Sequence, residues 1–168
     1  MEITSVKSFL GYYERIRERT NRVIQVIPPD KMEWSYKPGK FTIADVVRHI
    51  AAIERHMYAE NVMGRPSSYN GCGKELADGY EAVLAYFTEM HRQSMELFGS
   101  LSDTDLQRKC ITPAGGEITV WKWLRAMVEH EIHHRAQLYI YLNMLDVKTP
   151  PIFGLTAEQV QEKSFKHL

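Results

Sequence analysis

The chain has 168 residues, which suits one domain with an ordinary hydrophobic core. Hydrophobic residues make up 44% and charged residues 25%, and 21 basic residues balance 21 acidic ones. This neutral total, without a basic cluster, argues against nucleic-acid binding, and no apolar run approaches the roughly 20 residues of a membrane-spanning helix. We therefore expect a single domain over residues 1–168 that binds neither nucleic acid nor a membrane.

The two cysteines bear on the cellular compartment. Cys72 and Cys110 are far apart in the sequence and form no Cys-x-x-Cys pair, so they predict neither a zinc ribbon nor a redox motif. The first residues lack the basic segment and the apolar run of a secretory signal peptide. Because free thiols suit a reducing environment, these features predict a cytoplasmic protein.

Two amphipathic helices are predicted in the first part of the chain. The first has apolar residues at steps of three and four, and the pair Pro28 and Pro29 should end it because proline cannot donate the next helical hydrogen bond. Its apolar positions are Val6, Phe9, Tyr13, Ile16, Val23 and Ile27. The second should begin after Thr42, a good N-cap, and end near Gly64. Its apolar stripe comprises Val46, His49, Ile50, Ile53 and Met57.

A loop, a third helix and a turn are predicted next. Residues 67–73 are rich in serine, glycine and asparagine and predict a surface loop. Apolar residues recur at helical spacing over residues 80–98, and this helix should end near Gly99. Residues 110–120 hold a Pro-Ala-Gly-Gly turn between β-branched residues, which predicts a small hairpin or an extended loop.

The last part of the chain completes the predicted fold. A fourth helix should cover about residues 119–145, and Thr156 with Glu158 could cap a short last helix. Four amphipathic helices without clear long strands predict an all-α four-helix bundle.

Five of the seven histidines lie in two of the predicted helices. On a helix, residues four apart lie on one face with Cβ atoms about 5–6 Å apart, so His130 and His134 can point two imidazoles at one ion. A third ligand must come from another element, and His49 is the leading candidate because it interrupts an apolar stripe. A lone histidine there is more often a hydrogen-bonded core residue, but one shared cation would satisfy three buried imidazoles. We expect these three histidines to bind one divalent metal ion.

Two further histidines leave alternatives open. His133 lies three residues after His130, but a pair three apart spreads by about 60° around the helix and a pair four apart by about 40°, which favours His134. His56 lies two turns beyond His49 and could line the same cavity or the end of the bundle.

Other residues are weaker candidates for the surroundings of the metal. The candidates for its pocket, or for contact with the ligands, are His133, His56, Asp45, Arg135, Tyr141 and Trp34. Asp45 lies one turn before His49 and could orient its second ring nitrogen or favour the helix start. Arg135 could reach a substrate or pair with a carboxylate at the bundle surface or a dimer contact. His91 and His167 have no companions, and we expect them at the surface.

Residues 130–134 also match the His-Glu-x-x-His pattern of zincin metalloproteases. In that alternative Glu131 would be the general base and a later carboxylate such as Glu158 the third ligand. A zincin needs a β-sheet before the motif that binds substrate as an added strand, and this chain predicts none. Because a five-residue match without its context is weak, we favour the three-histidine site.

Five stretches of the sequence carry a family resemblance. They are HIAAIERH at 49–56, TPAGG at 112–116, WKWL at 121–124, HEIHHRAQL at 130–138 and PPIFGL at 150–155. Together they resemble the DinB/YfiT-like family over nearly the whole chain. The histidine triad of that family maps onto His49, His130 and His134, and Ala136 stands where glycine is common, a small-for-small change.

The resemblance implies a fold, a cofactor and an assembly. It implies a four-helix bundle in an up-down-down-up arrangement, usually homodimeric, with zinc or nickel in an open three-histidine site. Members of the family include transferases that use low-molecular-weight thiols such as bacillithiol or mycothiol, a mycothiol-dependent isomerase, and proteins classed as metal-dependent hydrolases.

Three functions follow from the histidines and the resemblance. We expect an enzyme that uses one divalent ion, zinc or nickel, to transfer a low-molecular-weight thiol, its co-substrate, to an electrophilic small molecule. A metal-dependent hydrolase is the alternative, with Glu54 or Glu131 as its base, although on their helices we expect both to be ordinary surface carboxylates. A third possibility is a protein that binds a metal or ligand without catalysis.

Overall fold

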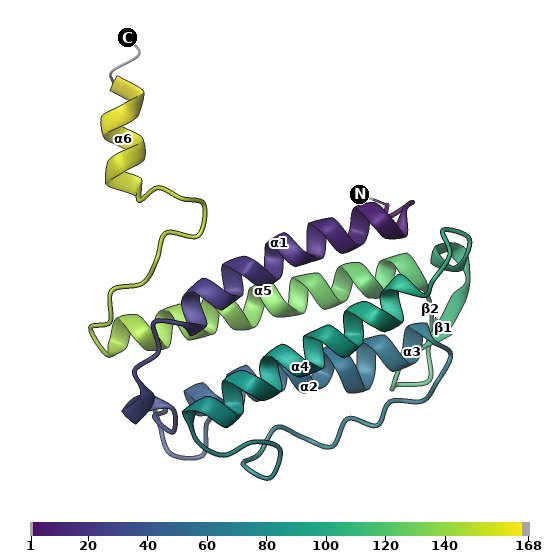
Figure 1. Ribbon diagram of the computed structural model, residues 1–168, viewed down its shortest axis with the longest axis horizontal. Coiled ribbons are helices and arrows are strands. Elements are labelled where there is room, and N and C mark those ends of the chain that lie inside the picture. The colour runs from purple at the N-terminus through teal and green to yellow at the C-terminus, as the bar shows by residue number, and fades with distance from the viewer. Residues whose placement is uncertain (1, 166–168) are drawn as a thin grey trace.

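The structure is a computed structural model that describes residues 2–165, and its body is a bundle of four helices (Figure 1). The four are α1 (Val6–Ile24), α2 (Ile43–Ile53), α4 (Tyr80–Gly99) and α5 (Val120–Met144). The shorter elements are the 3-10 helices η1 (Pro29–Lys31) and η3 (Asp105–Gln107), the π-helix η2 (Glu54–Ala59), the helices α3 (Glu60–Val62) and α6 (Ala157–Phe165), and the strands β1 (Lys109–Ile111) and β2 (Glu117–Thr119). The predicted four-helix bundle is confirmed.

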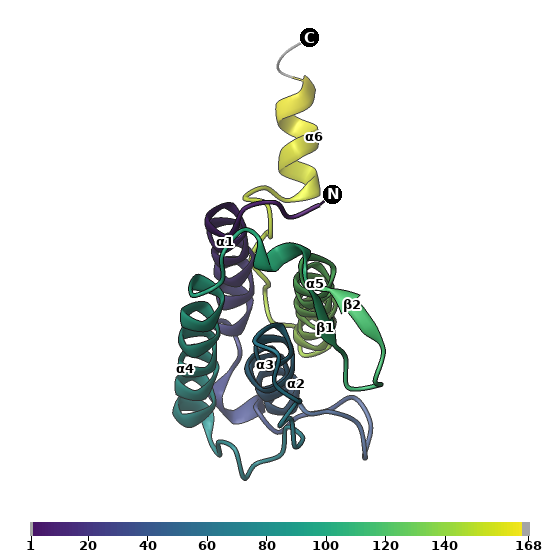
Figure 2. The same cartoon turned by 90° about the vertical axis from the view of Figure 1, so that its right-hand side faces the viewer.

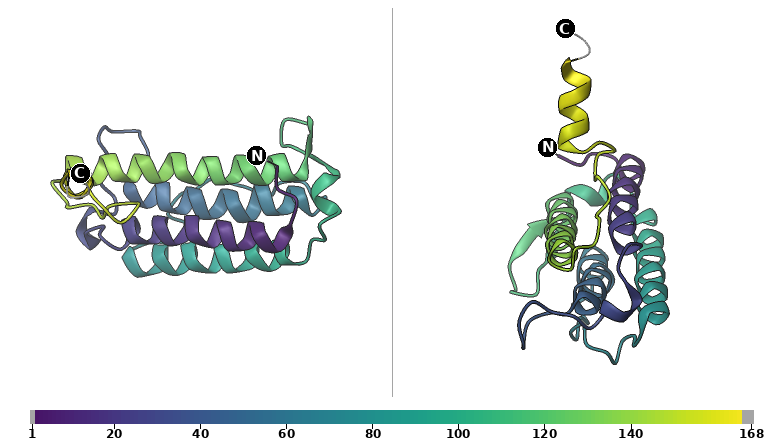
Figure 3. Two further views of the ribbon diagram at one scale, coloured as in Figure 1. Left: turned by 90° about the horizontal axis from the view of Figure 1, so that it is seen from above. Right: turned by 90° about the vertical axis from the view of Figure 1, so that its left-hand side faces the viewer.

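The connections between the four helices set their directions. The chain turns back after α1, so α2 runs in the opposite direction (Figures 1 and 3). Residues 63–79 then return along the bundle, and α4 therefore runs parallel to α2. The hairpin of β1 and β2 reverses the chain once more, so α5 runs parallel to α1. The result is the up-down-down-up order, in which α2 and α5 pack as antiparallel neighbours.

Two hydrophobic clusters fill the bundle along its length. One joins α2 to the second half of α5, through residues such as Val47, Ile50 and Leu138. The other joins α1 to the first half of α5, through residues such as Phe9 and Leu124. The apolar positions predicted for α1 are all buried. The three- and four-residue spacing therefore identified the packed face correctly.

The start of α2 follows the prediction, whereas its second half does not. The Thr42 hydroxyl accepts a hydrogen bond from the Asp45 amide at 3.0 Å, and the Asp45 carboxylate accepts one from the Thr42 amide at 2.9 Å. This reciprocal capping box fixes the first turn. After Ile53 the helix continues as the π-helix η2, which no sequence pattern predicts, and then as α3. Helix α3 ends at Val62, near Gly64 as expected, and Gly64 takes a positive φ of 75°.

Two further elements test the predicted boundaries. Helix α1 ends at Ile24, before the two prolines, because the chain passes there into turns. In one of them the Ile27 amide donates a hydrogen bond to the Ile24 carbonyl at 3.1 Å. Of the two alternatives for residues 110–120, the hairpin is confirmed, with Lys109 opposite Thr119 in an antiparallel pair.

The last helix, α6, stands away from the bundle (Figure 2). Its predicted cap at Thr156 is present, but the reciprocal partner is Gln159 and not Glu158. The Thr156 amide donates to Gln159 Oε1 at 2.9 Å, because Gln159 occupies the third helical position that a capping box uses. Within the described residues no helix is long and apolar enough to cross a membrane.

A buried ionic cluster crosses the centre of the bundle. The Arg17 guanidinium of α1 pairs with Glu54 at the start of η2 and with Glu131 of α5, the latter at 3.1 Å. The Thr20 hydroxyl donates to Glu131 at 2.6 Å, and His91 Nδ1 of α4 lies 2.9 Å from Glu54. Each carboxylate thus has hydrogen-bond partners that replace water, as buried charges require.

This cluster corrects three sequence expectations. Glu54 and Glu131 are each 1% exposed, so neither is a surface carboxylate. The side chain of His91 is also largely buried, because Glu54 and the ring of Tyr13 pack against it. His167, the other histidine expected at the surface, lies outside the described residues.

Candidate metal centre

Three histidines converge between α2 and α5. His49 comes from the middle of α2, and His130 and His134 come from successive turns of α5. One ring nitrogen from each lies within 4.8 Å of the others, and His49 Nε2 lies 3.1 Å from His130 Nε2. Two imidazoles on one tetrahedral zinc ion, each about 2.0–2.1 Å away, would place their nitrogens about 3.4 Å apart. The rings therefore lie close to the spacing that a shared ion requires.

The ring of His49 is fixed by a residue from the loop after α3. The Tyr69 hydroxyl lies 2.8 Å from His49 Nδ1, and the two rings meet edge to face. The ring of Phe41 covers the histidine from another side, with a centroid separation of 5.4 Å. Because Nδ1 is engaged by Tyr69, Nε2 is the nitrogen left for an ion.

The ring of His134 is fixed from within its own helix. His134 Nδ1 lies 2.9 Å from Gln137 Oε1, which can only accept, so Nδ1 carries the hydrogen. Gln137 Nε2 in turn donates to the Tyr141 hydroxyl at 2.9 Å. This chain leaves His134 Nε2 unprotonated and available as a ligand.

Burial keeps the three rings uncharged. Desolvation, with the neighbouring histidine rings adding to it, lowers the pKa of His49 to about 4 and that of His130 to about 3. Burial also lowers the pKa of His134, against an opposing effect of Gln137. All three rings are therefore neutral near pH 7, the form that coordinates a metal. Each histidine is only partly buried, so the cluster is not closed off from solvent.

The π-helix η2 holds the loop that carries Tyr69. A π-helical segment shifts the hydrogen-bond pattern and leaves carbonyl groups available to other partners. The His56 carbonyl accepts hydrogen bonds from the Ser67 hydroxyl and the Ser68 amide, both at 2.9 Å. The Ser67 hydroxyl also accepts from the Tyr69 amide at 3.2 Å. The irregular end of α2 thereby positions a contact of the His49 ring.

The structure separates the remaining predicted residues of α2 and η2 from the cluster. His56 Nδ1 faces Ser68 at 3.4 Å and does not join the three rings. Asp45 caps its helix and pairs with Arg48 at 2.6 Å, so the helix-start alternative is correct and the contact with His49 is absent.

Of the predicted residues on α5 and beside it, some contact the histidine cluster and others point elsewhere. His133 is exposed and touches only the outer side of His134, with ring centroids 4.9 Å apart. Arg135 points to α1, where it donates to the Ile16 carbonyl at 3.2 Å. Tyr141 is connected to the cluster through Gln137, and Trp34 packs edge to face on Tyr141.

The arrangement argues against the zincin alternative. Glu131 points into the ionic cluster, where Tyr13 and Thr20 donate to its carboxylate, so it is not free to act as a base at the histidines. Glu158 lies on the projecting helix α6. Within the described residues, the one candidate metal group consists of His49, His130 and His134 alone.

Tyr69 and Gln137 are the contacts that sequence reasoning missed. Gln137 lies three residues after His134, a helical spacing that allows side-chain contact and could have identified it. Tyr69 lies in an irregular loop, and no spacing rule relates it to His49.

Comparison with known proteins places this site in context. Residues 12–138 match the sequence model of the DinB superfamily. The protein YjoA of Bacillus subtilis is 26% identical over 153 residues, which cover 88% of this chain and 93% of YjoA. A protein of Oceanobacillus iheyensis, named "Putative metal-dependent hydrolase OB0782", is also 26% identical over 153 residues, covering 82% of this chain and 87% of its own.

Solved structures share the fold. A DinB-like protein from Bacillus cereus superposes with a TM-score of 0.75 at 15% identity, over 88% of this chain and 97% of the other. The mycothiol-dependent maleylpyruvate isomerase superposes with a TM-score of 0.60 at 14% identity. That match covers 79% of this chain and 60% of the isomerase.

Proposed function

Since the chain belongs to the DinB superfamily, we propose that it is a metal-dependent enzyme that transfers a low-molecular-weight thiol to an electrophilic small molecule. The observation that carries the proposal is the convergence of three neutral imidazoles, from His49, His130 and His134, at one accessible point. A divalent ion held by three neutral ligands would keep its double charge and an open position, and would favour the ionised form of a thiol or water that reaches it.

The protein residues around the three histidines have separate tasks. Tyr69 and Gln137 orient two of the ligand rings, and Gln137 also fixes the tautomer of His134. Phe41 and Tyr69 place aromatic surface beside His49, which suits an acceptor with an apolar or conjugated body.

Thiol chemistry suits this site better than hydrolysis because neither carboxylate considered as a base is available to it. An ordinary thiol has a pKa of about 8.5 and bulk water one of about 15.7, so a thiol ionises near neutral pH with less assistance. The two carboxylates considered as bases, Glu54 and Glu131, are both paired with Arg17 inside the bundle. The name of the isomerase, which has the same fold, adds support because that protein depends on a thiol.

Hydrolysis is the second candidate function. It is supported by the name of the Oceanobacillus iheyensis relative, which calls that protein a metal-dependent hydrolase. The discriminating property is the thiol requirement. Turnover of an electrophile that needs added thiol supports transfer, whereas turnover of an ester or amide without thiol supports hydrolysis.

Metal content and activity of two histidine variants test the proposal. Protein prepared without a histidine tag should hold about one equivalent of zinc or nickel by elemental analysis, and His130→Ala should lose it together with thiol transfer. His133→Ala is the matched control, because this exposed histidine on the same helix lies outside the cluster, and it should keep metal and activity.

Three results would contradict the proposal. Less than about half an equivalent of metal in the metal-replete wild type would remove its basis. Thiol transfer that survives in His130→Ala would exclude a role of the ion in the reaction. A metal-loaded protein that turns over no electrophile with any of several low-molecular-weight thiols would leave metal binding without catalysis.

A further inference from the structure

A hollow beside the β1–β2 hairpin, called here the hairpin hollow, lies apart from the histidine cluster. Its volume of about 580 Å³ is typical of small-molecule sites, and none of the three histidines lines it. One wall comes from residues 61 and 64–67, at and after the end of α3, and the other from residues 109–113 and 115 of the hairpin. Both walls lie at the end of the bundle that faces the viewer in Figure 2.

The walls of the hairpin hollow carry positive charge without a counter-charge. Arg65 lines it from one wall and Lys109 from the other, and no acidic residue of the described chain lines it. Both side chains are exposed, and within residues 2–165 neither forms an ion pair. The Lys109 ammonium donates to the Thr119 hydroxyl at 3.2 Å, which leaves further donors for a ligand. Two unpaired cations on facing walls favour an anion between them.

Asn61, in the same wall as Arg65, adds an unpaired acceptor. It is 2% exposed, and its Nδ2 donates to the Arg65 carbonyl at 3.1 Å. Because a carbonyl can only accept, this bond fixes the orientation of the side-chain amide. Oδ1 is then left buried without a hydrogen-bond partner within the described residues. Buried acceptors are nearly always paired, so the hairpin hollow has a place for an N–H or O–H donor.

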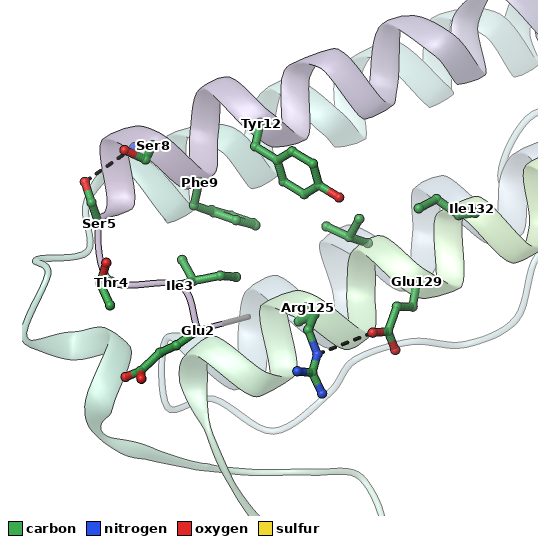
Figure 4. A pocket seen from close by; sticks show the side chains of 11 residues that line it. Glu2, Ile3, Thr4, Ser5, Ser8, Phe9, Tyr12, Arg125, Glu129 and Ile132 are labelled. Atoms are coloured by element: carbon green, nitrogen blue, oxygen red, sulfur yellow. Dashed lines mark hydrogen bonds and ion pairs between the residues drawn. The ribbon is translucent and has the colours of Figure 1, made fainter. Parts of the chain in front are cut away.

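The hollow between α1 and α5 has no such unmet groups. Figure 4 shows its mainly apolar walls, with Phe9 and Ile132 facing into the space between the two helices. Arg125, the one cation among the described residues that line it, is paired with Glu129 at 3.3 Å. Its charge is therefore balanced within the chain, and we expect no anion to bind there.

We propose that the hairpin hollow binds a small carboxylate with an amide N–H beside it, the chemistry of an N-acyl amino acid. The planar guanidinium of Arg65 matches a carboxylate, and Lys109 adds a second charge. The ligand N–H would donate to Asn61 Oδ1. Ile111, which is 53% exposed, and Pro113 offer apolar surface for the acyl group. A phosphate dianion fits less well, because its oxygens can only accept and would leave Asn61 Oδ1 unpaired.

Titration with hippurate (N-benzoylglycine), followed by heteronuclear NMR of the full chain, tests the site. The amides of both walls, such as those of Gly64 and Gly115, should shift. Replacing both cations, by Arg65→Ala with Lys109→Ala, should raise the dissociation constant roughly 10-fold or more, because the carboxylate loses its charged partners. Arg125→Ala is the matched control, because this arginine lines the other hollow, and it should leave the affinity unchanged.

Two analogues of hippurate separate the charge from the hydrogen bond without altering the protein. N-benzoylglycinamide lacks the negative charge and should bind roughly 10-fold more weakly. 3-Benzoylpropionate has a methylene group in place of the N–H and should bind roughly 3-fold or more weakly, because it leaves Asn61 Oδ1 unpaired. This comparison tests Asn61 without a substitution in the buried wall.

Several results would overturn the proposal. They are an absence of shifts at the two walls, equal affinity for hippurate and either analogue, and tighter binding of inorganic phosphate than of hippurate. His130→Ala should bind hippurate as the wild type does, and loss of binding in that variant would assign the ligand to the metal ion instead. The hairpin hollow contains no metal ligand, so failure of this proposal leaves the proposed chemistry unaffected.

Discussion

At the scale of single residues, the candidate centre depends on which nitrogen each imidazole presents. His49 and His134 each have Nδ1 engaged, by Tyr69 and by Gln137, and each therefore presents Nε2 to the common point. Both contacts restrict ring rotation, and the Gln137 contact also restricts the tautomer of His134. Such restrictions favour metal binding because less order must be gained when the ion binds.

Replacing Tyr69 by phenylalanine should weaken metal binding while leaving the three ligands in place. Loss of the hydroxyl removes the partner of His49 Nδ1, and we expect the metal dissociation constant to rise roughly 10-fold. Competition with a chromophoric chelator measures this change. Tyr80→Phe, at the start of α4, is the control, and an equal dissociation constant in Tyr69→Phe and wild type would exclude an orienting role for the hydroxyl.

The residue scale also shows how far the sequence predicts the site. His130 and His134 can be identified from the sequence because residues four apart lie on the same face of a helix. His49 was identifiable because a polar residue interrupts an apolar stripe. Tyr69 was not, because its contact depends on a loop path that no periodicity encodes, and loop paths follow from tertiary hydrogen bonds.

At the scale of elements, the ionic cluster around Arg17 connects three of the four helices and η2. The Arg17 guanidinium also lies over the ring of Phe87 on α4, 4.2 Å from its centroid. Charged residues are expected at the surface, so helical periodicity alone gave no sign that Arg17, Glu54 and Glu131 would be buried together. The π-helix was equally unpredictable, because its cause is tertiary and not a local sequence preference.

Removing the cation from this cluster should destabilise the bundle strongly. Arg17→Ala leaves two buried carboxylates without their partner, and we expect a loss of about 3–5 kcal/mol in the free energy of unfolding. Arg15→Ala, at an exposed position of the same helix, should cost less than about 0.5 kcal/mol. Urea unfolding followed by circular dichroism compares them. Similar midpoints for the two variants would show that the buried pairs contribute little.

At the scale of the whole molecule, the candidate centre joins the two antiparallel neighbours α2 and α5. These helices are separated in sequence by α4 and the hairpin, so an ion between them would close a long loop of chain. The packed core does not need this closure, because two hydrophobic clusters already run the length of the bundle. The overall fold was predictable for the same reason, since the amphipathic stripes alone determine which faces are buried.

Metal binding should nevertheless raise the thermal stability of the whole bundle. An ion that binds only the folded state at about 1,000 times its dissociation constant adds about 4 kcal/mol, which corresponds to roughly 10 °C in Tm for a chain of this size. Thermal unfolding with zinc and after chelation measures the shift. His130→Ala should show none, and an equal shift in that variant would place the stabilising ion elsewhere.

The return segment over residues 63–79 has a consequence for how such a protein can diversify. Because α2 and α4 run parallel, this segment must span the bundle, and it carries Tyr69 past the histidines on the way. Its length is limited mainly by the entropy of loop closure, which grows slowly with added residues. Insertions and deletions in residues 63–79 would therefore change the shape and the chemistry of the surroundings of His49. The helices and the three imidazoles would keep their positions. One scaffold can in this way acquire new substrates by varying a single connection.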